Sequence, residues 1–365
     1  MQLPRLVSTK LFLLSLTVIA CSSGPSQNGV PDAGVQVEVG ARSEPLPPTG
    51  FARHASGELV AFDPATGREL ARRPLGFEIV DLEWDERTRR VLVTGAEGFD
   101  VEGSRVHALA FDGTDFTHEA SSDVFPGEVR VIASPARVLV IGGEVGSDWH
   151  ELDDDLGVVG TSGALPQPLL VAEPDADSVL ALRRAAHADL VYRVSGFAAG
   201  WASAELALPR SAPERAALLA RAGERAWLLR RGDEPEGFAV ASLETAGSLG
   251  SGSFRPVPGS CGLGVPRSVG VDASGGALVT VTGAALDRLA VVPTSPGATT
   301  RCAELGATLA RAEEWVPRNL LVERGGRRAW VATEAGVESF ALEASVERVR
   351  SFAGVELRAP MALAR

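Results

Sequence analysis

The hydrophobic pattern from residue 51 onward consists of short apolar or alternating segments. Gly, Pro, Asp and Ser separate these segments, as in residues 79–84 and 91–95. Alternation over short runs is typical of β-strands, and no convincing run of the 3.6-residue helical period appears. The pattern therefore predicts an all-β domain.

The same unit recurs along this region: an apolar strand, a polar turn and a second strand. The spacing between successive second strands averages about 48 residues, which leaves room for four short strands in each unit, as in a β-propeller blade. A proline stands near each first strand, and we expect it at the strand's start because it cannot donate to a ladder. The second strands begin at Val91, Val138, Val179, Ala226, Ala277 and Ala329, and the prolines are Pro126, Pro168, Pro213, Pro266, Pro317 and Pro360.

The two ends of the repeat region complement each other. Residues 359–365 form a first strand with nothing after it, whereas residues 51–54 and 57–63 look like later strands without a first. Joining them closes a seventh blade, and closure removes free sheet edges. We predict seven blades. Six or eight blades, a β-helix and a two-domain sandwich are the alternatives.

The first residues predict export. Arg5 and Lys10 precede an apolar run over residues 11–20. A basic start followed by a short apolar run is typical of a signal peptide, and the run is too short for a permanent membrane span. Residues 18–21, Val-Ile-Ala-Cys, resemble the lipobox of bacterial lipoproteins. The resemblance implies cleavage before Cys21, acylation of that cysteine and, with Ser22 next, an outer-membrane location in the cell envelope. Ordinary secretion is the alternative.

Composition divides the chain into three parts. Residues 1–20 are the expected signal peptide, residues 21–50 are a flexible tether rich in Ser, Gly and Pro, and residues 51–365 are the propeller. The formal charge is −12 and becomes −14 once cleavage removes Arg5 and Lys10, the latter being the sole lysine. This acidity argues against binding to nucleic acid.

Residues 59–70, LVAFDPATGREL, resemble the strand–turn–strand of YVTN/lactonase-like and PQQ-like propellers. We expect Asp63 and Thr66 to hydrogen-bond turn amides and Gly67 to supply a positive φ. The resemblance implies the fold across residues 51–365. Later copies keep only fragments, and the aromatic residue of PQQ-like repeats is absent near Arg72, so no quinone cofactor is implied.

Catalytic motifs are absent from the sequence. Neither Gly-x-Ser-x-Gly nor His-Glu-x-x-His occurs, and the five histidines lie far apart. The acidic run Asp153, Asp154 and Asp155 is the candidate for a divalent cation. The EF-hand spacing fails because Ala164 stands where a glutamate is required, and a polar hairpin turn closed by Gly157 is the alternative we favour.

Cys261 and Cys302 are the cysteines that remain besides Cys21. An exported protein meets an oxidising compartment, so the two are candidates for a disulfide. Their separation of 41 residues is close to one repeat, and two thiols at equivalent, distant blade positions are the alternative. The six tryptophans lie mostly in or beside strands, which favours packing between blades over a ligand cage.

Three functions are compatible with these features. The first is a lipid-anchored, non-enzymatic propeller that binds a protein or another envelope component. The second is a lactonase-like or other hydrolase with a metal in the central channel, using carboxylates such as Asp81, Glu83 and Asp272. The third, a quinone-dependent redox role, has the weakest support. We favour the first.

Overall fold

The fold is known from a computed structural model. It describes residues 46–96, 103–142, 148–164, 170–171, 178–195, 201–209, 217–232, 237–245, 248–259, 261, 265–272, 274–283, 287–309, 319–352 and 356–364. The expected signal peptide and Cys21 lie outside this part of the chain. One compact unit extends from Leu46 to the C-terminus, so it includes the last residues of the expected tether.

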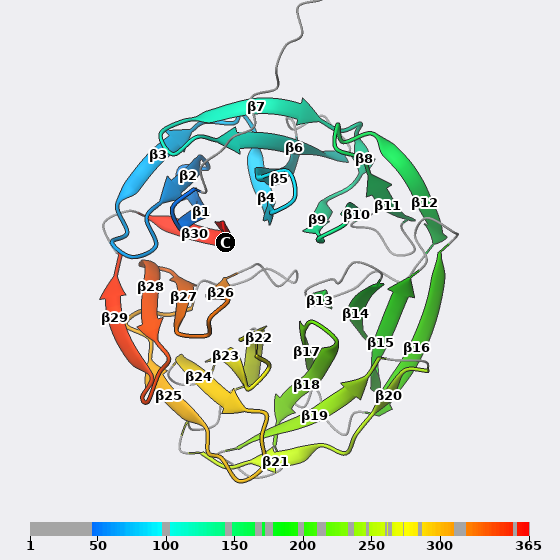
Figure 1. The fold of residues 1–365 in the computed structure, drawn as a ribbon, viewed down its shortest axis with the longest axis vertical. Helices are drawn as coiled ribbons and strands as arrows, with labels where there is room; N and C mark the ends of the chain where they lie inside the picture. The colour runs from blue at the N-terminus through cyan, green and yellow to red at the C-terminus, as the bar shows by residue number, and fades with distance from the viewer. Residues whose placement is uncertain are drawn as a thin grey trace, which may run out of the picture. The chain divides into compact units, whose positions relative to one another are not determined.

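This unit is a seven-bladed β-propeller, as predicted (Figure 1). Each blade is an antiparallel sheet of four strands, and a short fifth strand extends blades 2 and 5. In Figure 1 the first strand of each blade lies nearest the centre and the fourth lies at the rim. The described residues form no helix of the length and apolarity that crossing a bilayer requires.

The strands of blades 1 to 4 are as follows. Blade 1 contains β30 (Leu357–Ala364), β1 (Thr49–His54), β2 (Leu59–Phe62) and β3 (Glu69–Arg73). Blade 2 contains β4 (Glu78–Asp85), β5 (Arg90–Ala96), β6 (Gly103–Phe111), β7 (Phe116–Ser121) and the short β8 (Phe125–Pro126). Blade 3 contains β9 (Val129–Ala133), β10 (Val138–Gly142), β11 (Asp148–Leu152) and β12 (Val158–Ala164). Blade 4 contains β13 (Leu170–Val171), β14 (Ser178–Arg184), β15 (Ala188–Ser195) and β16 (Ala202–Pro209).

The remaining three blades complete the ring. Blade 5 contains β17 (Leu218–Ala222), β18 (Arg225–Arg231), β19 (Phe238–Glu244), β20 (Gly250–Ser251) and the short β21 (Arg255–Val257). Blade 6 contains β22 (Val265–Val271), β23 (Ala277–Gly283), β24 (Arg288–Pro293) and β25 (Arg301–Glu304). Blade 7 contains β26 (Leu320–Val322), β27 (Arg328–Thr333), β28 (Gly336–Ala341) and β29 (Glu347–Ser351).

Blade 1 closes the ring with strands from both ends of the described chain. The C-terminal β30 pairs with β1, placing Phe51 opposite Ala362 and Gly50 opposite Leu363. The red and blue strands therefore lie side by side in Figure 1. This closure, with one strand from the C-terminal end and three from the N-terminal end, confirms the sequence prediction.

The second strands read as continuous apolar runs because both of their faces are covered. Val91, Leu92 and Val93 of β5 are all fully buried. Val91 and Val93 join a cluster with Phe51 of blade 1, whereas Leu92 joins a different cluster with Val131 of blade 3. Each blade therefore packs on both neighbours, and burial between the blades forms the core.

Side-chain hydrogen bonds also join neighbouring blades. Asp189 Oδ2 at the start of β15 accepts from the Ala217 amide just before β17, at 2.7 Å. Asp287 repeats this contact in blade 6, where its Oδ2 accepts from the Leu309 amide at 2.7 Å. These carboxylates satisfy backbone donors on the segments that lead into the next blade.

The prolines expected at the start of first strands occupy different positions. Pro266 and Pro360 lie within β22 and β30, and the register of each strand shifts there by a bulge. A bulge interrupts the ladder, so proline is tolerated inside the strand at that point. Pro126 belongs to β8, and Pro168, Pro213 and Pro317 lie outside the described residues.

The turn at residues 63–67 has the predicted construction. Asp63 Oδ1 accepts from the amides of Ala65 and Thr66, and Asp63 Oδ2 accepts from Thr66 Oγ1 at 2.6 Å. These hydrogen bonds, led by that from Thr66, lower the pKa of the Asp63 carboxyl. Thr66 Oγ1 accepts from the Arg68 amide, and Gly67 has φ +73°.

Most of the tryptophans in the described part of the chain pack in the interior, as expected from their positions in or beside strands. Trp227 and Trp330, at equivalent repeat positions, are both buried against apolar residues of their own and neighbouring blades. Trp84 and Trp149 are buried as well. Trp201 is half-buried, and Trp315 lies outside the described residues.

Candidate functional site: a histidine–serine pocket between blades 1 and 2

The acidic run proposed as a cation site forms a turn between β11 and β12. Asp153 Oδ1 accepts from the amides of Asp155 and Gly157, at 3.0 and 2.7 Å. Asp154 forms an ion pair with Arg87 of blade 2. Asp153 thus binds amides of its own turn, whereas Asp154 binds an arginine of the neighbouring blade, so the two carboxylates do not share a partner. Within the described residues, no three His, Cys, Asp or Glu side chains gather as a metal would need.

The carboxylates proposed for a hydrolase also have structural contacts. Asp81 Oδ2 on β4 accepts from the Val131 amide on β9, at 3.1 Å, and so joins blades 2 and 3. Asp272 follows β22 and caps its own turn, accepting from Ser274 Oγ at 2.8 Å. Glu83 is half-buried on β4. Asp81 and Asp272 form separate hydrogen bonds in blades 2 and 6, and neither belongs to a group of three His, Cys, Asp or Glu side chains within the described part of the chain.

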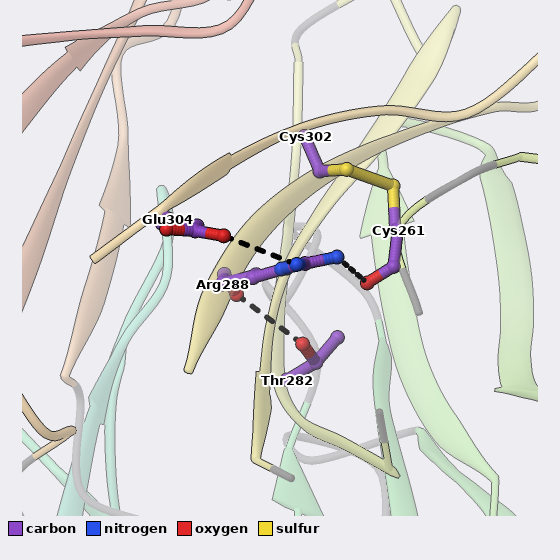
Figure 2. The surroundings of a disulfide bond; sticks show 5 residues. All are labelled: Cys261, Thr282, Arg288, Cys302 and Glu304. Atoms are coloured by element: carbon purple, nitrogen blue, oxygen red, sulfur yellow. Dashed lines mark hydrogen bonds and ion pairs between the residues drawn. A yellow bond between two sulfur atoms is a disulfide. The ribbon is translucent and has the colours of Figure 1, made fainter. Parts of the chain in front are cut away.

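The structure joins Cys261 to Cys302 by a disulfide (Figure 2). Their Cα atoms are 5.8 Å apart, within the usual range for such a bond. Cys302 lies on β25, whereas Cys261 lies in the connection between β21 and β22, so the two positions are not equivalent in the repeat. Arg288 Nη1 donates to the Cys261 carbonyl oxygen at 2.7 Å, and its Nη2 donates to Glu304 at 3.1 Å.

A cavity of about 530 Å³ lies between blades 1 and 2. Arg73 of β3 and the connection of residues 74–77 form one wall. His107 and Leu109 of β6, with His118 and Ser121 of β7, form the other. The cavity therefore combines two imidazoles, a hydroxyl and a guanidinium with apolar side chains, which is the usual composition of a small-molecule site.

A β-bulge in β7 directs the polar side chains into this cavity. Residues His118 and Ser121 are three positions apart, so in a regular strand they would point to opposite faces. Ala108 pairs with Ala120 and Leu109 pairs with His118, which leaves Glu119 as an extra residue. The bulge restores both side chains to the face that carries His107.

Ser121 stands between the two histidines. Its Oγ lies 2.9 Å from His107 Nδ1 and 2.8 Å from His118 Nε2. A hydroxyl carries one proton, so when both imidazoles are neutral it donates to one ring and accepts from the other. The buried ring of His107 also stacks on Phe77, with centroids 4.5 Å apart, so Phe77 and Ser121 hold it from two sides.

The sequence did not reveal this cluster. The five histidines lie far apart in the sequence, and His118-Glu119 lacks the second histidine of a His-Glu-x-x-His motif. The available signal was the hairpin at residues 111–116, in which Phe111 pairs with Phe116. Counting outward from that turn in both directions places the two histidines on adjacent strands. The bulge is what places both side chains on the same face of the sheet.

A second cavity of about 840 Å³ lies between blades 4 and 5. Its basic side chains hold the two blades together, because Arg221 Nη1 donates to Ser178 Oγ at 3.1 Å and Arg193 donates to the Thr245 carbonyl oxygen. Glu224 and Glu244 also line it. Its charges are therefore mixed, in contrast to the cavity between blades 1 and 2.

Comparison with known proteins identifies the fold. No family model and no curated protein matches the sequence. A protein of unknown function from Desulfotomaculum acetoxidans matches 87% of this chain and 99% of its own, with 13% identity and a TM-score of 0.65. A candidate 6-phosphogluconolactonase from Bacteroides fragilis matches 87% and 97%, with 13% identity and a TM-score of 0.56.

Another similar structure belongs to a protein of different activity. The hydrazine synthase of Kuenenia stuttgartiensis matches 82% of this chain and 90% of its own, with 11% identity and a TM-score of 0.58. A fold shared at such low identity does not transfer an activity. The chain is a seven-bladed β-propeller that is similar to these proteins in fold alone.

Proposed function

We propose that this protein is a lipid-anchored binding protein of the bacterial cell envelope, without catalytic activity. The expected lipobox at residues 18–21 supports the anchor. The disulfide between Cys261 and Cys302 supports export, since such bonds persist in oxidising compartments. Acylation of Cys21 then tethers the propeller to the outer membrane.

The cavity between blades 1 and 2 is the observation that carries the binding role. It presents Arg73, His118 and Ser121 beside apolar walls. By contrast, Asp81, Asp153 and Asp272, which were candidates for metal chemistry, form hydrogen bonds within the fold. The pocket is therefore the place where we expect an envelope component to bind.

Lipid labelling tests the anchor. The full chain, expressed in a bacterium that processes lipoproteins, should incorporate radioactive palmitate and sediment with membranes. The Cys21→Ala variant should do neither. Equal labelling of both proteins would show that the anchor assignment is wrong.

Site-specific photo-crosslinking tests the binding role in intact cells. A photoreactive benzoylphenylalanine replaces Pro74, an exposed residue that lines the pocket, and Val349, an exposed residue on β29, serves as the control position. We expect an adduct at position 74 that is absent at position 349. No adduct at 74, or the same adducts at both positions, would contradict a role for the pocket.

A further inference from the structure

We propose that the pocket between blades 1 and 2 binds a small organic carboxylate with a planar, apolar body. This inference rests on the proposed binding function and names the class of ligand for the same site. It follows from the charge of the pocket, the hydrogen-bond donors in it and the shape of its walls.

The charge of the pocket is opposite to that of the chain. The chain has 47 acidic residues and a formal charge of −12. The described residues that line the pocket include Arg73, His107 and His118 but no Asp or Glu. A local basic site in an acidic protein attracts anions.

The acidic residues that border the pocket are engaged elsewhere. Glu78 follows the connection of residues 74–77 and pairs with Arg53 at 3.1 Å. Glu119, the extra residue of the bulge, lies 4.0 Å from Arg90 Nη1. Glu119 is not among the described residues that line the pocket. Both glutamates therefore pair with arginines other than Arg73, and the positive charge of Arg73 can attract an anionic ligand.

The donors suit a carboxylate. Arg73 Nη1 donates to the Phe116 carbonyl oxygen, which holds the guanidinium at the pocket and uses one of its five N–H groups. A guanidinium binds a carboxylate through two parallel, charge-assisted hydrogen bonds. When Ser121 Oγ accepts from His107 Nδ1 and donates to His118 Nε2, the Nδ1–H group of His118 remains as a further donor to an anionic oxygen.

The walls suit a planar, apolar body. Phe77 and His107 stack with an interplanar angle of 19°, so their rings form a nearly parallel pair beside Leu75 and Leu109. Aromatic ligands pack on such rings by offset or edge contacts. A volume of about 530 Å³ is within the range for a drug-sized ligand.

Three probes separate these contributions. 2-Naphthoate carries both the carboxylate and the planar body, 2-naphthalenemethanol lacks the charge, and acetate lacks the body. Calorimetry on the full, purified protein should show the tightest binding for 2-naphthoate, with the other two weaker by about tenfold or more, as expected for the loss of a charge-assisted hydrogen bond or of an apolar contact.

Variants assign the binding to the pocket. Arg73→Gln and His118→Gln should each weaken 2-naphthoate binding, the former by about tenfold or more. Arg324→Gln, an exposed arginine in the turn before β27, should bind as the wild type does. Circular dichroism and the unfolding midpoint establish that each variant is folded.

Histidine-selective NMR gives a readout that does not depend on affinity. The chain has five histidines, and 2-naphthoate should shift the resonances of His107 and His118 while leaving those of His54 and His187 unchanged. The inference fails if no histidine resonance shifts, if 2-naphthalenemethanol binds as tightly as 2-naphthoate, or if Arg73→Gln and Arg324→Gln behave alike. If 2-naphthoate does not bind but a crosslink forms at position 74, only the ligand class is overturned. If 2-naphthoate binds but no crosslink forms at position 74, the proposed envelope partner is overturned.

Discussion

Trp330 Nε1 donates a hydrogen bond of 2.9 Å to the carbonyl oxygen of Pro64, a residue 266 positions earlier in the chain. The two groups belong to blades 7 and 1, where the N-terminal strands meet the last complete repeat. Arg350 Nη1 donates to the Thr66 carbonyl oxygen in the same turn, at 3.0 Å. The turn at residues 63–67 therefore joins the two blades at the closure of the ring.

Loss of this hydrogen bond should destabilise the protein. Trp330→Phe keeps an aromatic ring but removes the donor to the buried Pro64 carbonyl, and we expect a loss of about 1–3 kcal/mol in the free energy of unfolding. Trp84→Phe is the matched control, because Trp84 Nε1 donates to the exposed Glu86. Urea unfolding measures both. An equal loss in the two variants would show that the contact between the blades contributes nothing particular.

Gly67 should tolerate no side chain. Its φ is +73°, and a Cβ there would overlap the ring of Phe352. Gly297 has φ +80° with open space around it, so Gly297→Ala measures the backbone strain alone, about 1–2 kcal/mol. We expect Gly67→Ala to lose at least about 1 kcal/mol more in unfolding free energy. Phe352→Leu should recover part of that difference, and equal losses at both glycines would contradict the predicted overlap.

The disulfide should contribute to stability. It closes a loop of 41 residues, for which the chain-entropy model predicts about 4 kcal/mol as an upper value. A reductant should lower the unfolding midpoint of the wild type and leave that of Cys261→Ser/Cys302→Ser unchanged. Mass spectrometry of the denatured, alkylated protein provides a direct check. Alkylation of both cysteines without prior reduction would show that they are free thiols.

His150 should make the fold less stable in mild acid. Burial is the main cause of its lowered pKa, and the Asp148 carboxylate partly opposes this shift. As the pH falls through about 6.5, the unfolded chain binds a proton on this residue before the folded protein does. The free energy of unfolding therefore decreases until the pH is below the folded-state pKa.

A substitution isolates that contribution. His150→Gln should show a smaller decrease in unfolding free energy between pH 7.5 and 5.5 than the wild type. The control is His187→Gln, at an exposed position in the turn between β14 and β15. Identical pH profiles for wild type and His150→Gln would contradict the prediction.

The blades could be read from the sequence because their signals are local. Alternating runs placed the second strands within one residue of their observed starts, as at Val91 and Val138. Asp63, Thr66 and Gly67 specified their turn because the hydrogen bonds and the positive φ lie within five residues. The complementary terminal fragments predicted the closure, since each was an incomplete copy of the same repeat.

The pocket could not be predicted in this way. The extra residue Glu119 changes which face His118 occupies, and no local pattern distinguishes a bulge from a regular strand. Asp81 seemed available for a metal, yet it accepts from Val131 on the next blade. The sequence by itself determined the positions of the second strands, the seven blades and the closure of the ring, because these depend on alternation and repetition. Only the tertiary structure decided which polar side chains meet at a site, because register and packing between blades depend on residues distant in the chain.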